Sequence, residues 1–161
     1  MWNGRHPDDA ANMDGALWGS VDHWKEGIIT RGVLLDVPKH RGEPYVTMET
    51  PVHGWELEDV ARSQGVAVEP GDAVVVYSGR EAWQESYAPY GATDPNRPGL
   101  HSSCLPFLRD NDVSVLVWDM MDAAPNEYDL AWTVHGAIFA YGVALVDNSL
   151  LEPLADVCAE E

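Results

Sequence analysis

Four short runs of apolar residues, rich in valine, constrain the fold of this chain more than any other feature. They cover residues 33–37, 73–77, 113–118 and 143–146. Runs that are mostly apolar, rather than alternating between apolar and polar, are typical of strands buried on both faces of a sheet. Stretches with helical character separate or follow them, at residues 56–64, 103–109, 131–141 and 150–159. We therefore predict an α/β fold with a mixed β-sheet and flanking helices.

The chain length fits a single domain over residues 1–161, and 45% apolar residues are enough for a core. We expect an irregular, tryptophan-rich arm at residues 1–30 and an α/β core at residues 31–161. The tryptophans of the arm follow no regular period: Trp2, Trp18 and Trp24. Such a segment is expected to pack on another surface or beside a ligand, unless it is simply an irregular arm.

The charge of the chain argues against two classes of partner. Acidic residues outnumber basic ones by 27 to 9, which gives a net charge of −18. This field repels phosphate backbones and anionic membranes, so we expect neither a nucleic-acid nor a membrane partner. Cys104 and Cys158 form no CxxC pair, and no apolar run reaches the length of a membrane span. We expect a cytoplasmic protein.

His135 is the first candidate for chemistry. If residues 131–141 are helical, His135 shares a face with Ile138 and Phe139, so its imidazole points toward the core. A buried imidazole needs a partner for both ring nitrogens, and a metal ion is one such partner. A core histidine satisfied by protein groups is the alternative.

Asp147 is the second candidate, because it directly follows the last apolar run. Carboxylates at the ends of strands commonly carry function in α/β folds. An imidazole and a carboxylate supply two ligands of a zinc or manganese site, which usually takes at least three from protein. The alternative is that Asp147 or Asn148 only starts a turn or caps the final helix.

An ordered series of short motifs resembles the cyclase family of metal-dependent hydrolases, which includes bacterial kynurenine formamidases and isatin hydrolases. The series covers nearly the whole chain: Gly32–Pro38, Pro70–Asp72, Ser78–Arg80, Pro98–His101, Trp118–Asp119, Thr133–His135, Tyr141–Val143 and Asp147–Leu150. The resemblance implies a swivelling β/β/α-like fold. It also implies hydrolysis of a small amide or lactone, such as the aromatic amide N-formylkynurenine, with a divalent zinc or manganese ion.

The resemblance assigns His135 and Asp147 to the metal site, since the family places a histidine and an acidic residue twelve positions apart in this segment. Many members have glutamate where this chain has Asp147. The family signature HxGTHxDxxxH, which supplies the remaining metal ligands and a catalytic histidine, is absent from this sequence. We therefore expect a chain incomplete at both ends that carries part of the metal site, self-associates and buries its arm. The alternatives are an inactive protein that has lost the metal and a subunit that needs a partner.

The remaining candidates are weaker. His101 stands before a helix start, where it either faces substrate as a second catalytic residue beside His135 or lies in a solvent-facing loop. Asp119 and Asp122 either line a pocket at a strand end or form turns. Three tryptophans suit either an aromatic substrate wall or the core: Trp83, Trp118 and Trp132. Four histidines lie in expected loops without ligand-like spacing: His6, His23, His40 and His53.

Overall fold

A four-stranded parallel sheet forms the centre of the computed structural model, which describes all residues except 1–5, 18–19, 92–93, 129, 131 and 161. The strands lie in chain order: β3 (Gly32–Asp36), β4 (Ala73–Tyr77), β5 (Val115–Trp118) and β6 (Ala144–Val146). All three pairings are parallel. The α/β architecture is confirmed, and antiparallel pairing occurs in a separate two-stranded sheet rather than in this one.

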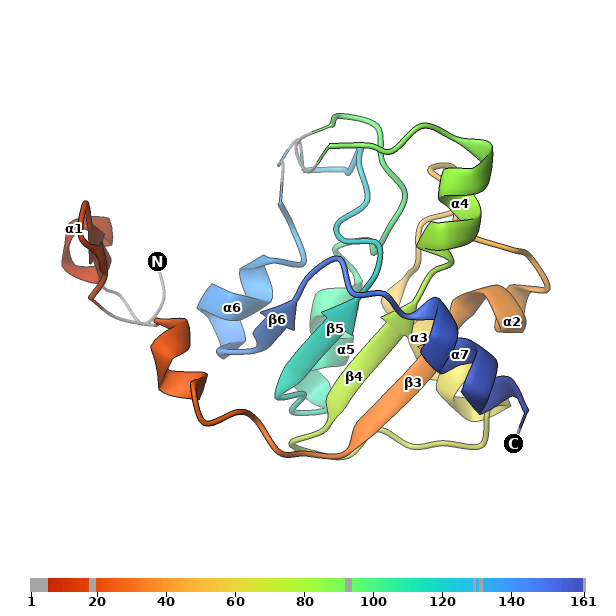
Figure 1. Ribbon diagram of the computed structural model, residues 1–161, viewed down its shortest axis with the longest axis horizontal. Helices are drawn as coiled ribbons and strands as arrows, with labels where there is room; N and C mark the ends of the chain where they lie inside the picture. Colours follow the sequence, from red (N-terminus) through yellow and green to blue (C-terminus); the bar gives the residue numbers. More distant parts are fainter. Residues whose placement is uncertain (1–5, 18–19, 92–93, 129, 131, 161) are drawn as a thin grey trace.

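Helices cover both faces of the sheet (Figure 1). Those that connect successive strands pack on one face, as right-handed crossovers in chain order require: α3 (Gly54–Ser63), α5 (Cys104–Asp110) and α6 (Gly136–Tyr141). The last helix, α7 (Glu152–Ala159), packs on the opposite face through Leu151 and Ala155. Two further short helices, α2 (Val37–Arg41) and α4 (Arg80–Ser86), begin at the carboxyl ends of β3 and β4.

The alternation of side chains along β4 explains why its apolar run is continuous. Val74 and Val76 point into the main core under α3 and α5, whereas Val75 and Tyr77 join the smaller cluster under α7. Successive side chains of a strand point to opposite faces, so a strand covered on both sides must be apolar throughout. The carboxyl ends of all four strands meet at one edge of this sheet, which is where polar groups gather.

The N-terminal arm extends away from the sheet (Figure 1). The described residues of the arm form four short elements: α1 (Pro7–Ala10), β1 (Ala11–Asn12), β2 (Gly15–Ala16) and the 3-10 helix η2 (Val21–Trp24). Met13 and Ile29 are almost fully exposed, and Trp24 is 42% exposed. Trp2 and Trp18 lie outside the described residues. None of the described helices is both long and apolar enough to cross a membrane.

Candidate functional site

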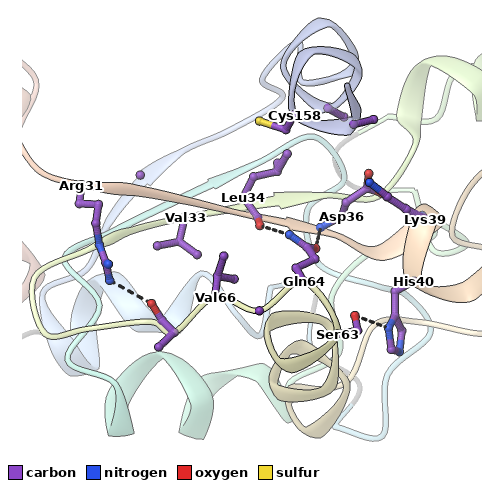
Figure 2. A pocket seen from close by; sticks show the side chains of 15 residues that line it. Arg31, Val33, Leu34, Asp36, Lys39, His40, Ser63, Gln64, Val66 and Cys158 are labelled. Carbon is purple, nitrogen blue, oxygen red and sulfur yellow. Dashed lines mark hydrogen bonds between the residues drawn. The ribbon is translucent and has the colours of Figure 1, made fainter. Parts of the chain in front are cut away.

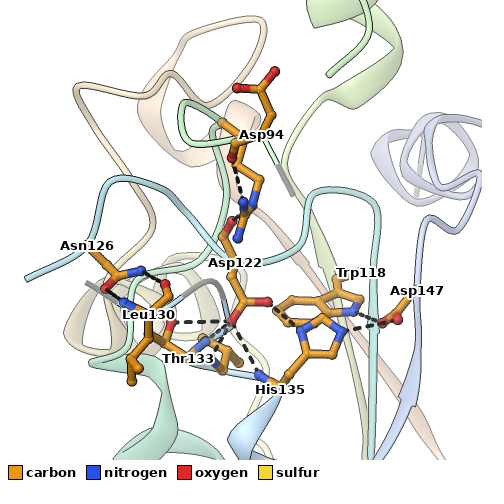
Figure 3. A network of polar contacts seen from close by, with 10 residues as sticks. Asp94, Trp118, Asp122, Asn126, Leu130, Thr133, His135 and Asp147 are labelled. Atoms are coloured by element: carbon orange, nitrogen blue, oxygen red, sulfur yellow. Dashed lines mark hydrogen bonds and ion pairs between the residues drawn. The ribbon is translucent and has the colours of Figure 1, made fainter. Parts of the chain in front are cut away.

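A carboxylate–imidazole–carboxylate network lies at the carboxyl edge of the sheet (Figure 3). Asp122 comes from the segment that follows β5, His135 precedes the first turn of α6, and Asp147 directly follows β6. Residues far apart in the sequence meet here because parallel strands end at the same edge. The structure thus brings His135 and Asp147 together, as the sequence predicted.

Asp122 anchors the network and is fully buried. Its Oδ1 accepts hydrogen bonds from the backbone amides of Thr133 (2.6 Å), Val134 (2.5 Å) and His135 (3.3 Å). Its Oδ2 contacts Nδ1 of His135 directly. Burial alone would raise the pKa of Asp122, but the hydrogen bonds from His135 and the backbone outweigh it and keep the pKa below its ordinary value. The carboxylate is therefore ionised.

His135 has a carboxylate at each ring nitrogen. Its Nε2 lies 3.3 Å from Oδ2 of Asp147, while Oδ1 of Asp147 accepts a 2.6 Å hydrogen bond from Nε1 of Trp118. Burial lowers the pKa of His135, but Asp122 and Asp147 together outweigh this effect and raise the pKa above its ordinary value. The two carboxylates therefore stabilise the protonated imidazole, a form in which both ring nitrogens can donate.

The same geometry fits two ligands of a metal ion. Ligands about 2.0–2.1 Å from a tetrahedral zinc ion lie roughly 3.3 Å apart, and Nε2 of His135 and Oδ2 of Asp147 are 3.3 Å apart. A carboxylate on the other ring nitrogen, as Asp122 provides, is the usual support of a metal-bound histidine. Within the described part of the chain, no group of three or more His, Cys, Asp or Glu side chains is arranged to hold a metal.

The local structure around His135 differs from the sequence prediction. The helix begins at Gly136, so His135 lies at its N-cap position and not on a core-facing helical stripe. Ile138 and Phe139 are 36% and 57% exposed, which shows that the predicted core-facing stripe was wrong. The backbone amides of residues 133–135 turn toward Asp122 instead, and this turn replaces the first part of the predicted helix.

Asp119 ties two strand ends together and does not line the site. Its carboxylate accepts hydrogen bonds from the backbone amides of Ser78 (2.9 Å), Gly79 (2.9 Å) and Arg80 (3.0 Å). Burial raises its pKa to about 6 despite these hydrogen bonds. Of the two alternatives for Asp119, the structure thus favours the turn-forming role, with the carboxylate holding the loop after β4.

Two of the three candidate tryptophans lie beside His135. The ring centroid of the His135 imidazole is 4.7 Å from that of Trp132 and 5.3 Å from that of Trp118. Trp118 is fully buried, whereas Trp132 is 37% exposed and so reaches the surface next to the imidazole. Trp83 instead packs in a separate aromatic cluster with Tyr45 and Tyr87. Trp118 is therefore a core residue, and Trp132 presents its ring at the surface beside the imidazole.

His101 lies in a different cluster. Its Nδ1 is 3.0 Å from Oγ of Ser103, and its ring centroid is 4.5 Å from that of His53. These contacts are separate from the hydrogen bonds of His135 in the described part of the chain.

Sequence reasoning also missed Asp122 as the partner of His135, because a spacing of thirteen residues across a loop carries no periodic signal.

A cavity of about 920 Å³ lies at the free edge of β3 (Figure 2). The side-chain amide of Gln64 pairs there with the carbonyl of Leu34 and the amide of Asp36, both at 2.8 Å. It thus satisfies peptide groups that a neighbouring strand would otherwise bind. The described residues that line this cavity include none of Asp122, His135 and Asp147, so its volume gives no evidence about the network.

Comparison with known proteins agrees with this architecture. The sequence model of the Cyclase family matches residues 5–125, a range that includes Asp122 and ends before His135. A solved structure described as a novel cyclase superposes with a TM-score of 0.79 at 20% identity. The match covers 99% of this chain but 56% of the other, so the chain spans little more than half of that protein's length. Among curated proteins, nothing matches. Because the family model covers most of the chain, this protein belongs to the cyclase family.

Proposed function

We propose that this chain belongs to a metal-dependent hydrolase that cleaves a small amide or lactone, and that it carries part of the metal site. One observation carries the proposal. The Nε2 of His135 and the Oδ2 of Asp147 have the 3.3 Å separation of two ligands on one tetrahedral ion, and Asp122 orients the imidazole from behind. A bound divalent metal, zinc or manganese, would polarise a carbonyl and lower the pKa of a bound water molecule.

The residues around the pair have defined tasks in this proposal. Asp122 keeps the proton of neutral His135 on Nδ1, which leaves the Nε2 lone pair free for the metal. Trp118 occupies Oδ1 of Asp147 and leaves Oδ2 for the ion. The half-exposed Trp132 offers an apolar surface next to the imidazole. This surface favours an aromatic substrate. Among the amide and lactone hydrolyses proposed here, the first to test is therefore an arylformamidase reaction of the kynurenine pathway type.

The second candidate is a protein that keeps the scaffold without independent turnover. It is favoured by the absence of a third metal ligand close to His135 and Asp147 within the described residues. In that case turnover requires a different chain that supplies the missing ligands. The exposed apolar side chains of the arm, such as Met13 and Ile29, support self-association. The two free cysteines fit a reducing, cytoplasmic compartment.

Metal content separates the two candidates. The protein is purified without chelators, and zinc and manganese are measured by elemental analysis in the wild type, His135→Ala and His40→Ala. His40 is an exposed histidine that lies away from the network, so its variant is the matched control. A near-stoichiometric metal content that falls only in His135→Ala supports the hydrolase, and formamide and lactone assays follow. Absence of metal from all three folded proteins supports the scaffold without chemistry.

A further inference from the structure

A surface groove of about 710 Å³ is lined by the loop that follows α2, by the start of α3 and by the residue after α4. Its aromatic lining consists of Tyr45 from the loop, Trp55 from α3 and Tyr87 after α4. Trp55 and Tyr87 are 62% and 49% exposed, so both present ring surface to a molecule in the groove. The described residues of its lining include no member of the carboxylate–imidazole network, so the groove is a separate feature.

Neighbouring rings hold the aromatic side chains of the groove in place. Tyr45 and Tyr87 stand at 90° to each other, with ring centroids 6.0 Å apart. Tyr87 also stacks on the buried Trp83, at 4.1 Å between centroids. Trp55 stacks on His53 at 5.8 Å and an interplanar angle of 12°. Because packed side chains lose little freedom on binding, these rings are already arranged to receive a ligand.

Arg41 lines the groove but has no hydrogen-bond donor left for a ligand. Its Nε and Nη2 donate to the two carboxylate oxygens of the buried Glu56, at 2.6 and 2.7 Å. Its Nη1 donates to the carbonyl and hydroxyl oxygens of Thr50, and Nη2 donates also to the carbonyl of Pro51. All five N–H groups of the guanidinium are thus used. The charge of Arg41 is balanced by Glu56, so this arginine does not draw an anion into the groove.

Two carboxylates of the lining have no partner in the described part of the chain: Glu43 and Glu49. Both side chains are exposed. Glu49 is close enough to Tyr87 to add to the raised pKa of that phenol, after the larger effects of Tyr45 and burial. The charge that remains in the groove is therefore negative. The faces of the aromatic rings carry negative potential as well, so both features attract a cation.

We propose that this groove binds a small organic cation whose charge is spread over alkyl groups, such as a quaternary ammonium compound. The alkyl groups contact the faces of Trp55 and Tyr87, and the charge is balanced by Glu43 and Glu49. A small inorganic ion keeps its water shell and gains little from the rings, whereas a neutral molecule gains nothing from the carboxylates. The organic cation gains from both.

The test is an NMR titration of the whole ¹⁵N-labelled chain in EDTA with choline. A second titration uses 3,3-dimethylbutan-1-ol, which has the shape of choline with carbon in place of the charged nitrogen. Potassium chloride, the third titrant, reports the effect of a simple cation. The variants are Glu49→Gln and Trp55→Leu. Glu58→Gln is the matched control, because Glu58 is an exposed carboxylate of α3 outside the lining.

We expect choline to shift the amide signals of residues 43–50 and the indole signal of Trp55 saturably, and the other two titrants not to do so. An exposed cation–π contact contributes about two- to fivefold in affinity, so Trp55→Leu should weaken choline binding by about this factor. Loss of an exposed charge has an effect of similar size, so Glu49→Gln should weaken binding by about two- to fivefold. Glu58→Gln should bind choline as the wild type does.

Four results would overturn the proposal: no saturable shifts with choline, equal affinity for the neutral alcohol, the same shifts with potassium chloride, or equal weakening in Glu49→Gln and Glu58→Gln. The last two would show that only the overall negative charge of the chain attracts the cation. The chelator keeps metal out of these titrations. A failure here is therefore distinct from a failure of the metal proposal.

Discussion

Replacing Asp122 by asparagine tests whether the buried carboxylate sets the tautomer of His135. The three backbone amides and the Thr133 hydroxyl that point at Oδ1 require an oxygen there, so the asparagine must place its NH2 group where Oδ2 was. That NH2 group can only donate. His135 must then offer a lone pair at Nδ1 and move its proton to Nε2, which removes the lone pair that a metal needs.

Asp122→Asn should lower both the stability of the fold and the affinity for metal. The variant loses one charge-assisted hydrogen bond, which amounts to about 1.5–3 kcal/mol of the free energy of unfolding. Changes to the residue that orients a metal-bound histidine typically weaken metal binding by about 10–100-fold. The neutral amide also no longer raises the pKa of His135 as the carboxylate does, so the imidazole of the variant is more easily deprotonated.

The assays are urea denaturation in EDTA and zinc titration by competition with a chromophoric chelator. The imidazole ¹⁵N chemical shifts report the tautomer of His135 independently. Asp110→Asn is the matched control, because Asp110 is an exposed carboxylate paired with Arg109 on the surface. The argument would be refuted if Asp122→Asn bound zinc with wild-type affinity and the proton of His135 remained on Nδ1. Asp122 would then serve folding alone.

Three further perturbations test other parts of the structure. Gly54→Ala should lower the free energy of unfolding by about 1–3 kcal/mol in urea denaturation, because its Cβ would overlap the Ser103 carbonyl; unchanged stability would contradict the close packing of α3 and α5. Trp118→Phe should weaken zinc binding, because it frees Oδ1 of Asp147 and loosens that carboxylate; wild-type affinity would contradict this. The pKa of Asp119 is about 6 in the folded state and near 4 in the unfolded state. The protonated Asp119 side chain therefore contributes its full stabilisation below about pH 4, and this contribution is lost as the pH rises through about 6. The difference in unfolding free energy between wild type and Asp119→Asn should therefore shrink between these pH values by on the order of 3 kcal/mol, and a pH-independent difference would show that the Asp119 pKa is unshifted.

Local patterns in the sequence were sufficient for the architecture. Continuous apolar runs located β3 to β6, since a strand covered on both faces has no polar side to encode. Gly65, just after α3, and Gly71, just before β4, both have positive φ, a conformation that glycine adopts readily. The short helices α2 and α4 were not predicted, because neither shows apolar residues at helical spacing within its bounds.

The contacts of the site were decided by the tertiary structure. The strand ends predicted that Asp147 reaches the sheet edge, but only the folded chain shows that Asp122 faces His135 and that Trp118 holds Asp147. The same is true of Ser103, which the structure places between the imidazoles of His53 and His101. Periodicity reports which face of an element is buried. It carries no information about which side chains from distant loops meet, because loop paths depend on packing over the whole domain.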